Sequence, residues 1–256
     1  MTLIAFRAAK KFAGHHTSTA GVGNPGSSDD GPVLIYTFGM QCQSQLCVYC
    51  NLAVADTVDH IPPKLLLAKP YPDNLLTVPA CLACNRSFQK DDEYTRFMTS
   101  VDMRSASQST VQTNLPSILR SIQRPESAKF TSYLLSQSQP STILGADGQP
   151  LGQCFEPDSD RMTATGRRMV RGLYFFETGQ PLPTSLEVRV ACKPGITSDH
   201  PDILKFARIF SSLPVQRQNS IGGAFEYAAG FHADWSTWLL VLYNQFTWLA
   251  IVQKPR

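Results

Sequence analysis

The chain has 256 residues, of which 43% are hydrophobic and 17% are charged, and its formal net charge is +3. This apolar content is enough for one large core or two small ones, which excludes wholesale disorder. The mild positive charge permits a nucleic-acid partner without predicting one. No apolar run approaches the ~20 residues of a membrane-spanning helix. We therefore expect no membrane partner and a cytoplasmic protein.

Residues 1–31 read as a flexible N-terminal arm. No acidic residue occurs between Met1 and Ser28, whereas serine, threonine and glycine are frequent. This composition resembles a targeting segment, and a disordered arm is the alternative that we favour. The arm lacks the apolar region of a secretory signal, so export is not expected.

Two C-x-x-C pairs are the strongest motif in the chain. Cys47-Val48-Tyr49-Cys50 and Cys81-Leu82-Ala83-Cys84 are separated by thirty residues. Pairs with this internal spacing are typical of zinc knuckles, and four thiolates close a tetrahedral site with no open position. The pattern therefore predicts a structural zinc ion, provided that the insert between the pairs folds back as a hairpin.

The insert does carry a hairpin pattern. The sequence predicts a strand over 57–60, which Pro62 and Pro63 end because proline cannot donate to a ladder. A returning strand is predicted over 75–78, and a helix over 85–103 follows the second cysteine pair. The expected order is knuckle, strand, loop, strand, knuckle and helix.

The second half of the chain is predicted to be α+β with a mostly antiparallel sheet. Helical periodicity covers 115–137, with an interruption at Pro125, and 138–158 is rich in glycine and proline and is predicted to be loop. A helix over 159–177 is expected to place Met162, Met169, Leu173 and Phe176 in the core, while Arg161, Arg167, Arg168 and Arg171 add positive charge. A strand over 186–192 and a helix over 203–213 follow. A meander over 225–232, 236–243 and 246–252 ends the chain, with a tight turn at 243–245.

The Asp59-His60 step carries candidate catalytic chemistry. Cleavage of a phosphodiester needs a base for the attacking water and positive charge for the developing anion. The imidazole of His60 suits the base, and the carboxylate of Asp59 is a hard oxygen ligand for a divalent cation. Asn85 offers a second oxygen ligand, and Asn74 is placed to hold the loop near His60. Each residue alone has an ordinary structural explanation, as a turn former, a helix cap or a surface residue.

These segments together resemble the H-N-H motif of HNH endonucleases with a four-cysteine zinc site. The matching residues are Asp59-His60-Ile61-Pro62-Pro63, Asn74-Leu75-Leu76-Thr77-Val78 and Cys81-Leu82-Ala83-Cys84-Asn85. The resemblance covers roughly residues 42–98 and implies a zinc-stabilised ββα-metal finger that hydrolyses nucleic acid. It assigns the general base to His60, the acidic metal ligand to Asp59, the loop-orienting residue to Asn74 and the last metal ligand to Asn85. Oxygen ligands favour Mg²⁺ or Mn²⁺ as the catalytic ion.

The resulting hypothesis divides the chain into three parts. Residues 1–31 form the arm, 32–104 the HNH nuclease domain, and 105–256 an α+β accessory domain for target recognition, partner docking or regulation. DNA is the expected substrate, RNA remains open, and a regulatory protein partner and a role in antiviral defence are further expectations. Candidate phosphate-binding residues are Lys64, Arg86, Lys90, Arg167 and Arg171. The alternative is a non-catalytic zinc module that binds nucleic acid or a protein.

Overall fold

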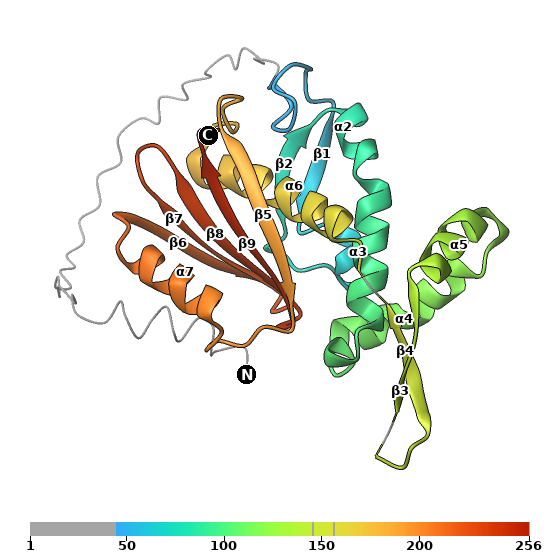
Figure 1. Cartoon of the computed structure of the whole chain (residues 1–256). Coiled ribbons are helices and arrows are strands. Elements are labelled where there is room, and N and C mark those ends of the chain that lie inside the picture. Colours follow the sequence, from blue (N-terminus) through green and yellow to red (C-terminus); the bar gives the residue numbers. More distant parts are fainter. Residues whose placement is uncertain (1–44, 145, 156, 256) are drawn as a thin grey trace, which may run out of the picture.

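The computed structural model describes residues 45–144, 146–155 and 157–255. The predicted arm over 1–31 and the start of the predicted nuclease domain lie outside the described residues. Within the described part, the protein is α+β: a small β-hairpin is followed by helices and then by a five-stranded antiparallel sheet (Figure 1). No described helix combines the length and the apolar character needed to cross a membrane.

The hairpin and helix between and after the cysteine pairs are confirmed. Strand β1 (Thr57–Ile61) pairs antiparallel with β2 (Leu76–Ala80), so that His60 faces Thr77 across the ladder. The prolines after β1 end the strand as predicted. The predicted helix over 85–103 is observed as two segments, α2 (Leu82–Ser87) and α3 (Gln89–Val101).

A helical extension follows residues 45–101, the region called the finger below, and projects from the body of the molecule (Figure 1). It consists of α4 (Ser109–Ile122) and α5 (Ala128–Ser136), with a 3₁₀ turn at Pro125–Ser127 where the sequence predicts an interruption. The prediction of a loop over 138–158 is wrong, because β3 (Ser138–Leu144) and β4 (Pro150–Phe155) form an antiparallel hairpin there. Its glycines and prolines mask the strand pattern, and Gly148 lies in the tip with φ of +74°.

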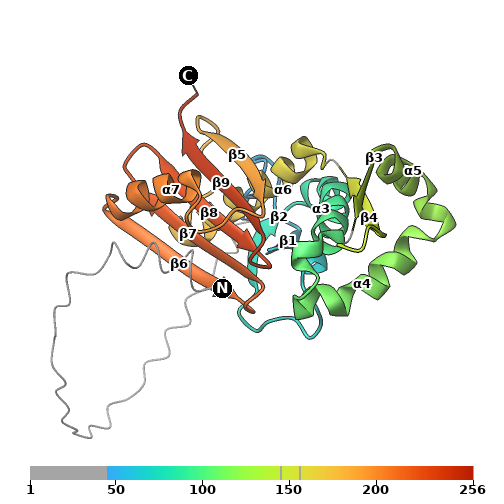
Figure 2. The same ribbon diagram turned by 60° about the horizontal axis from the view of Figure 1, so that its bottom comes forward.

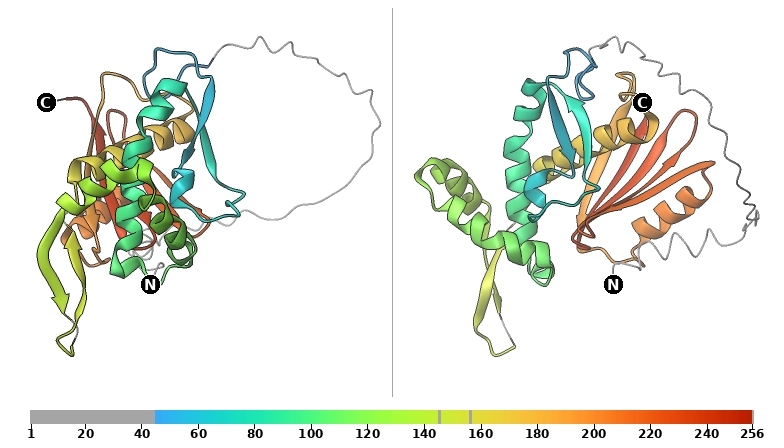
Figure 3. Two further views of the ribbon diagram at one scale, coloured as in Figure 1. Left: turned by 90° about the vertical axis from the view of Figure 1, so that its right-hand side faces the viewer. Right: turned by 180° about the vertical axis from the view of Figure 1, so that it is seen from behind.

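Helix α6 (Ser159–Thr178) lies between the finger and the large sheet (Figures 2 and 3). Its N-cap is Asp158, whose side chain accepts the backbone N–H groups of Asp160 and Arg161, and Gly179 ends it with a left-handed φ of +70°. The helix contacts β1, β2 and α3 on one side and β5 and β9 on the other.

The sheet has the strand order β5-β9-β8-β7-β6. The predicted strands are confirmed as β5 (Glu187–Pro194), β7 (Phe225–Phe231), β8 (Ser236–Leu242) and β9 (Phe246–Gln253), and the predicted helix as α7 (Pro201–Ser211). Strand β6 (Val215–Ile221) was not predicted, since its residues VQRQNSI are mostly polar and it lies at the sheet edge. The expected turn at 243–245 connects the paired residues Leu242 and Phe246, and Tyr243 and Asn244 in it have positive φ.

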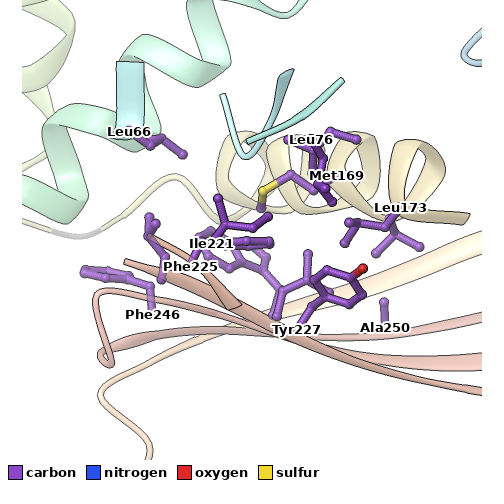
Figure 4. Close-up of a cluster of buried hydrophobic side chains, with 14 of the residues drawn as sticks. Leu66, Leu76, Met169, Leu173, Ile221, Phe225, Tyr227, Phe246 and Ala250 are labelled. Carbon is purple, nitrogen blue, oxygen red and sulfur yellow. The ribbon is translucent and has the colours of Figure 1, made fainter. Parts of the chain in front are cut away.

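Apolar side chains from α6 and from one sheet face form the main core (Figure 4). Met169 and Leu173 of α6 are buried against residues such as Tyr227 and Phe225, and Leu76 of the finger joins the same cluster. Helix α7 covers the other face, where Phe206 and Phe210 are buried. The core therefore includes residues on both sides of the boundary predicted between 104 and 105.

Two side chains of α6 are placed differently from the prediction. Phe176, expected in the core, is 45% exposed, whereas Arg168, expected on the charged outer face, is only 4% exposed. The sequence period indicates one apolar stripe, but this helix is covered on two sides. A second buried stripe therefore includes Arg168 and excludes Phe176.

The crossing of α6 over β1 leaves little space at Gly172. A Cβ atom on Gly172 would lie 2.0 Å from Cδ1 of Ile61 and 3.3 Å from the Tyr49 hydroxyl. We expect Gly172→Ala to lower the free energy of unfolding by about 1–3 kcal/mol through overpacking, despite its better helix propensity. Denaturant unfolding measures the loss.

The control is a double-mutant cycle with Ile61→Val, which removes the clashing methyl group. The two substitutions together should cost less than the sum of the two single losses. Strictly additive losses would contradict the proposed contact.

Candidate functional site

The four cysteines of the two predicted knuckles come together. The Sγ atoms of Cys47, Cys50, Cys81 and Cys84 all lie within 4.8 Å of one another. A tetrahedral site with Zn–S bonds of about 2.3 Å places its sulfurs about 3.8 Å apart. The cluster beside a β-hairpin and a helix is consistent with a structural zinc module.

Local backbone features shape the first knuckle. Asn51, directly after Cys50, adopts φ of +56°, a left-handed conformation that asparagine tolerates better than most residues. Its backbone N–H donates to the carbonyl of Cys47 over 2.9 Å, which closes the turn. The N–H of Val48 donates to the carbonyl of Pro79 over 3.1 Å, so the knuckle is attached to the end of β2.

The second knuckle is the start of α2. Cys81 is the N-cap, and its Sγ accepts the backbone N–H of Cys84 over 3.5 Å. Asp56, just before β1, accepts the N–H of Leu82 over 2.7 Å. These contacts bring the second pair of sulfurs to the first.

Proton affinities differ within the cysteine cluster. Backbone N–H groups of Ala53 and Leu52 lower the pKa of the Cys50 thiol to about 7. Burial, together with the neighbouring cysteines, raises the pKa of the Cys84 thiol. Four crowded thiols resist simultaneous ionisation, and a bound zinc ion removes this conflict because it stabilises all four as thiolates.

The side chain of Asp59 points into the protein. Asp59 is 4% exposed and lies on the buried face of β1 with Ile61. Its Oδ1 accepts the N–H of His60 over 2.8 Å and a bond from Nη2 of Arg168. Its Oδ2 accepts the hydroxyl of Tyr49 and, over 2.8 Å, Nε of Arg168. All four hydrogen bonds come from the protein.

Arg168 connects Asp59 to a second buried carboxylate. Its Nη1 pairs with Oδ2 of Asp92 on α3, and Asp92 is 5% exposed. Cζ of the guanidinium lies 4.7 Å from the centre of the Phe88 ring. One arginine thus serves two carboxylates, and Oδ1 of Asp92 has no hydrogen-bond partner.

The Asp59 carboxylate, which is expected to hold a catalytic Mg²⁺ or Mn²⁺, does not fit that role in this arrangement. Both oxygens of Asp59 are saturated by donors, and the guanidinium already provides the positive charge. The Nδ2 of Asn85 donates to Oγ1 of Thr57 over 3.3 Å and to the carbonyl of Val58 over 3.2 Å. Asn85 therefore attaches α2 to the edge of β1.

His60 lies on the face of β1 opposite to Asp59, because successive strand residues alternate. It is half-buried, and its neighbour on the same face, Val58, is 57% exposed. Burial lowers the pKa of His60 below its ordinary value, and the nearby ammonium of Lys64 adds to this, while Asp59 opposes it. The imidazole is therefore neutral at pH 7.

The side chain of Asn74 bonds to the large sheet. Its Nδ2 donates over 2.7 Å to the carbonyl of Ser220 in β6. This bond ties the loop before β2 to the edge of the large sheet. No described contact of Asn74 reaches His60.

The five candidate phosphate-binding residues belong to three different places. Lys64 follows β1 beside His60, Arg86 and Lys90 are exposed on α2 and α3, and Arg167 and Arg171 lie on α6. Arg167 donates to the carbonyl of Val188 over 3.3 Å. Residues 45–101 carry five Lys or Arg residues and six Asp or Glu residues, so the finger as a whole is not basic.

Sequence reasoning missed three residues at this site. Arg168, Asp92 and Tyr49 surround Asp59, yet each looks like a surface or packing residue in its own segment. A faint signal existed for Asp92, since the run Asp91-Asp92-Glu93 places one acid on the apolar face of α3. Nothing in the local pattern marks the pairing of Arg168 with Asp59, which are 109 positions apart.

Comparison of the chain with protein-family models, with curated proteins and with solved structures finds no match. The class of the protein is therefore defined by its own features: an α+β fold with a four-cysteine cluster beside a β-hairpin.

Zinc removal is expected to unfold the finger, because zinc–thiolate bonding contributes on the order of 10 kcal/mol to small modules. A strong chelator or Cys81→Ser should lower the melting temperature and release one zinc ion per chain, measured by calorimetry and metal analysis. Cys192→Ser is the control for metal content, since Cys192 lies outside the cluster and its replacement should leave the zinc content unchanged. Full stability after complete metal removal would contradict a structural zinc.

Asp92 is expected to make stability depend on pH. Burial is the main cause that raises its pKa from 3.8 to about 6, and attraction by Arg168 only partly opposes it. The folded protein then holds a proton that the unfolded chain has lost, so stability falls as pH rises from about 4 to 6 and is constant above. Between pH 5 and pH 7 the wild type should lose about 1 kcal/mol more than Asp92→Asn.

Denaturant unfolding at the two pH values measures this difference. The zinc site titrates equally in both proteins, so its contribution cancels in the comparison. Equal losses in the two proteins would show that Asp92 stays ionised throughout this range.

Proposed function

We propose that this chain is an HNH-type endonuclease that hydrolyses phosphodiester bonds of nucleic acid, with His60 as the general base. The observation that supports the proposal most directly is the position of His60. The zinc-clamped hairpin presents its imidazole on the open face of β1, next to the exposed Lys64. The base on β1 is thus close to a positive charge in the turn that follows the strand.

The mechanism follows from these two side chains. The neutral imidazole of His60 accepts a proton from a water molecule, and the resulting hydroxide attacks the phosphorus. The bond from phosphorus to one bridging sugar oxygen then breaks, and that oxygen leaves as an alcohol after it takes a proton from solvent. Lys64 attracts the phosphate and offsets the negative charge that develops on its oxygens. The predicted zinc supports the fold only, since four cysteines leave no open coordination position. The residues present supply no site for a second ion at Asp59.

The substrate and setting belong to the same proposal. Duplex DNA is the proposed substrate, and RNA is the alternative, because both polymers present the same scissile bond. The region after residue 104, with its projecting hairpin and five-stranded sheet, is proposed to choose the target or to dock a regulatory partner. A function in antiviral defence would fit a nuclease controlled in this way.

The proposal predicts that His60→Ala abolishes cleavage and leaves the fold intact. Plasmid nicking and a labelled RNA measure activity side by side, and the loss should be at least about 10²-fold, the usual contribution of a general base. His232→Ala is the matched control, since His232 is an exposed histidine beyond the end of β7. Equal cutting by wild type and His60→Ala, or no cutting of either polymer by the wild type, would contradict the proposal.

The second candidate function is a non-catalytic zinc module. It is favoured by one observation: Asp59 and Asn85, two of the expected catalytic residues, are used for internal hydrogen bonds. Under this candidate, wild type and His60→Ala bind a labelled duplex or a protein partner equally well, and neither cleaves nucleic acid. Fluorescence anisotropy with the same two proteins distinguishes the candidates.

A further inference from the structure

We propose that the guanidinium of Arg168 permanently takes the place of a divalent cation at Asp59. The HNH resemblance implies an ion on this carboxylate, whereas the structure provides an organic cation from α6. The catalytic consequence, hydrolysis without an ion on Asp59, rests on the proposed function. The binding consequence does not, since it concerns the apo-finger alone.

The guanidinium of Arg168 matches the positions of both carboxylates. Nε and Nη2 of Arg168 contact the two oxygens of Asp59, and Nη1 contacts Asp92. The planar fork of an arginine allows this division, which a lysine ammonium cannot reproduce with the same directions. The three hydrogen bonds bridge β1 and α3, the strand and helix that form the finger.

The hydrogen-bonding capacity of the Asp59 carboxylate is fully used. An ionised carboxylate accepts about four hydrogen bonds, and Asp59 accepts four, from Arg168, Tyr49 and the His60 backbone. A metal ion would have to displace at least one of these donors. It would also be repelled by the guanidinium in a place where little water screens the charges.

The two carboxylates and the guanidinium are buried. Asp59, Asp92 and Arg168 are each at most 5% exposed, and the Phe88 ring covers the guanidinium. Hard ions such as Mg²⁺ retain several water molecules when they bind to proteins. While the guanidinium fills the space between the two carboxylates, a hydrated ion has no room there.

Replacement of Arg168 by methionine is expected to create a manganese site. Without the guanidinium, the carboxylates of Asp59 and Asp92 lose the cation that they share, and we expect a divalent cation to take its place between them. Manganese titration followed by electron paramagnetic resonance, on zinc-loaded full-length protein without nucleic acid, measures binding directly. The wild type should leave the manganese signal unchanged, and Arg168→Met should take up one ion per chain.

Matched variants define the site. Arg161→Met is the control on the same helix, because Arg161 pairs with the partly exposed Asp91 and should not create a manganese site. Asp59→Asn in the Arg168→Met background should remove the new binding. Circular dichroism establishes that each variant is folded.

Two results would overturn the proposal. One is wild-type protein that binds manganese and loses it on Asp59→Asn, because the carboxylate would then be free for an ion. The other is a folded Arg168→Met variant that takes up none. If Arg168→Met does not fold, manganese binding by the wild type and by Asp59→Asn tests the proposal. None of these readouts depends on cleavage, so failure of the nuclease proposal is recognised separately.

Discussion

The guanidinium of Arg168 lies between the carboxylates of Asp59 and Asp92, and the arrangement of three elements depends on this contact. Burial of charged groups is costly unless they are paired and hydrogen-bonded. Neither carboxylate has another cation among its described contacts, so β1, α3 and α6 must meet at one point. The glycine at position 172 allows the helix to approach β1 closely enough for this meeting.

Two cations therefore organise the finger in different ways. The proposed zinc joins the knuckles on either side of the hairpin, which is a local task within residues 47–84. Arg168 joins the hairpin and α3 to a helix that is far along the chain and that also covers the sheet. For this reason the core is continuous from the knuckles to β9, and the finger is integrated with the rest of the protein.

Successive residues of β1 point to opposite faces, so the side chains of Asp59 and His60 lie on different sides of the strand. The acid faces inward, where it is bound by Tyr49 and Arg168, and the imidazole lies on the opposite, partly exposed face. The bond from the His60 N–H to Asp59 connects the two sides, since it holds the backbone under the imidazole. The dipeptide that resembles a metal-and-base pair thus places the acid in a buried hydrogen-bond network and the half-buried imidazole on the opposite face of the strand.

The sequence by itself determined the features that depend on near neighbours. The cysteine spacing, the prolines after β1, the alternating strands of the C-terminal meander and the apolar period of α6 each act over a few residues. Strand β6 and the β3–β4 hairpin escaped prediction because a polar edge strand and a glycine- and proline-rich hairpin lack an apolar alternation. Only the tertiary structure decided the partner of Asp59. Arg168 is 109 positions away, and an arginine on a helix is indistinguishable from a surface residue until packing removes it from water.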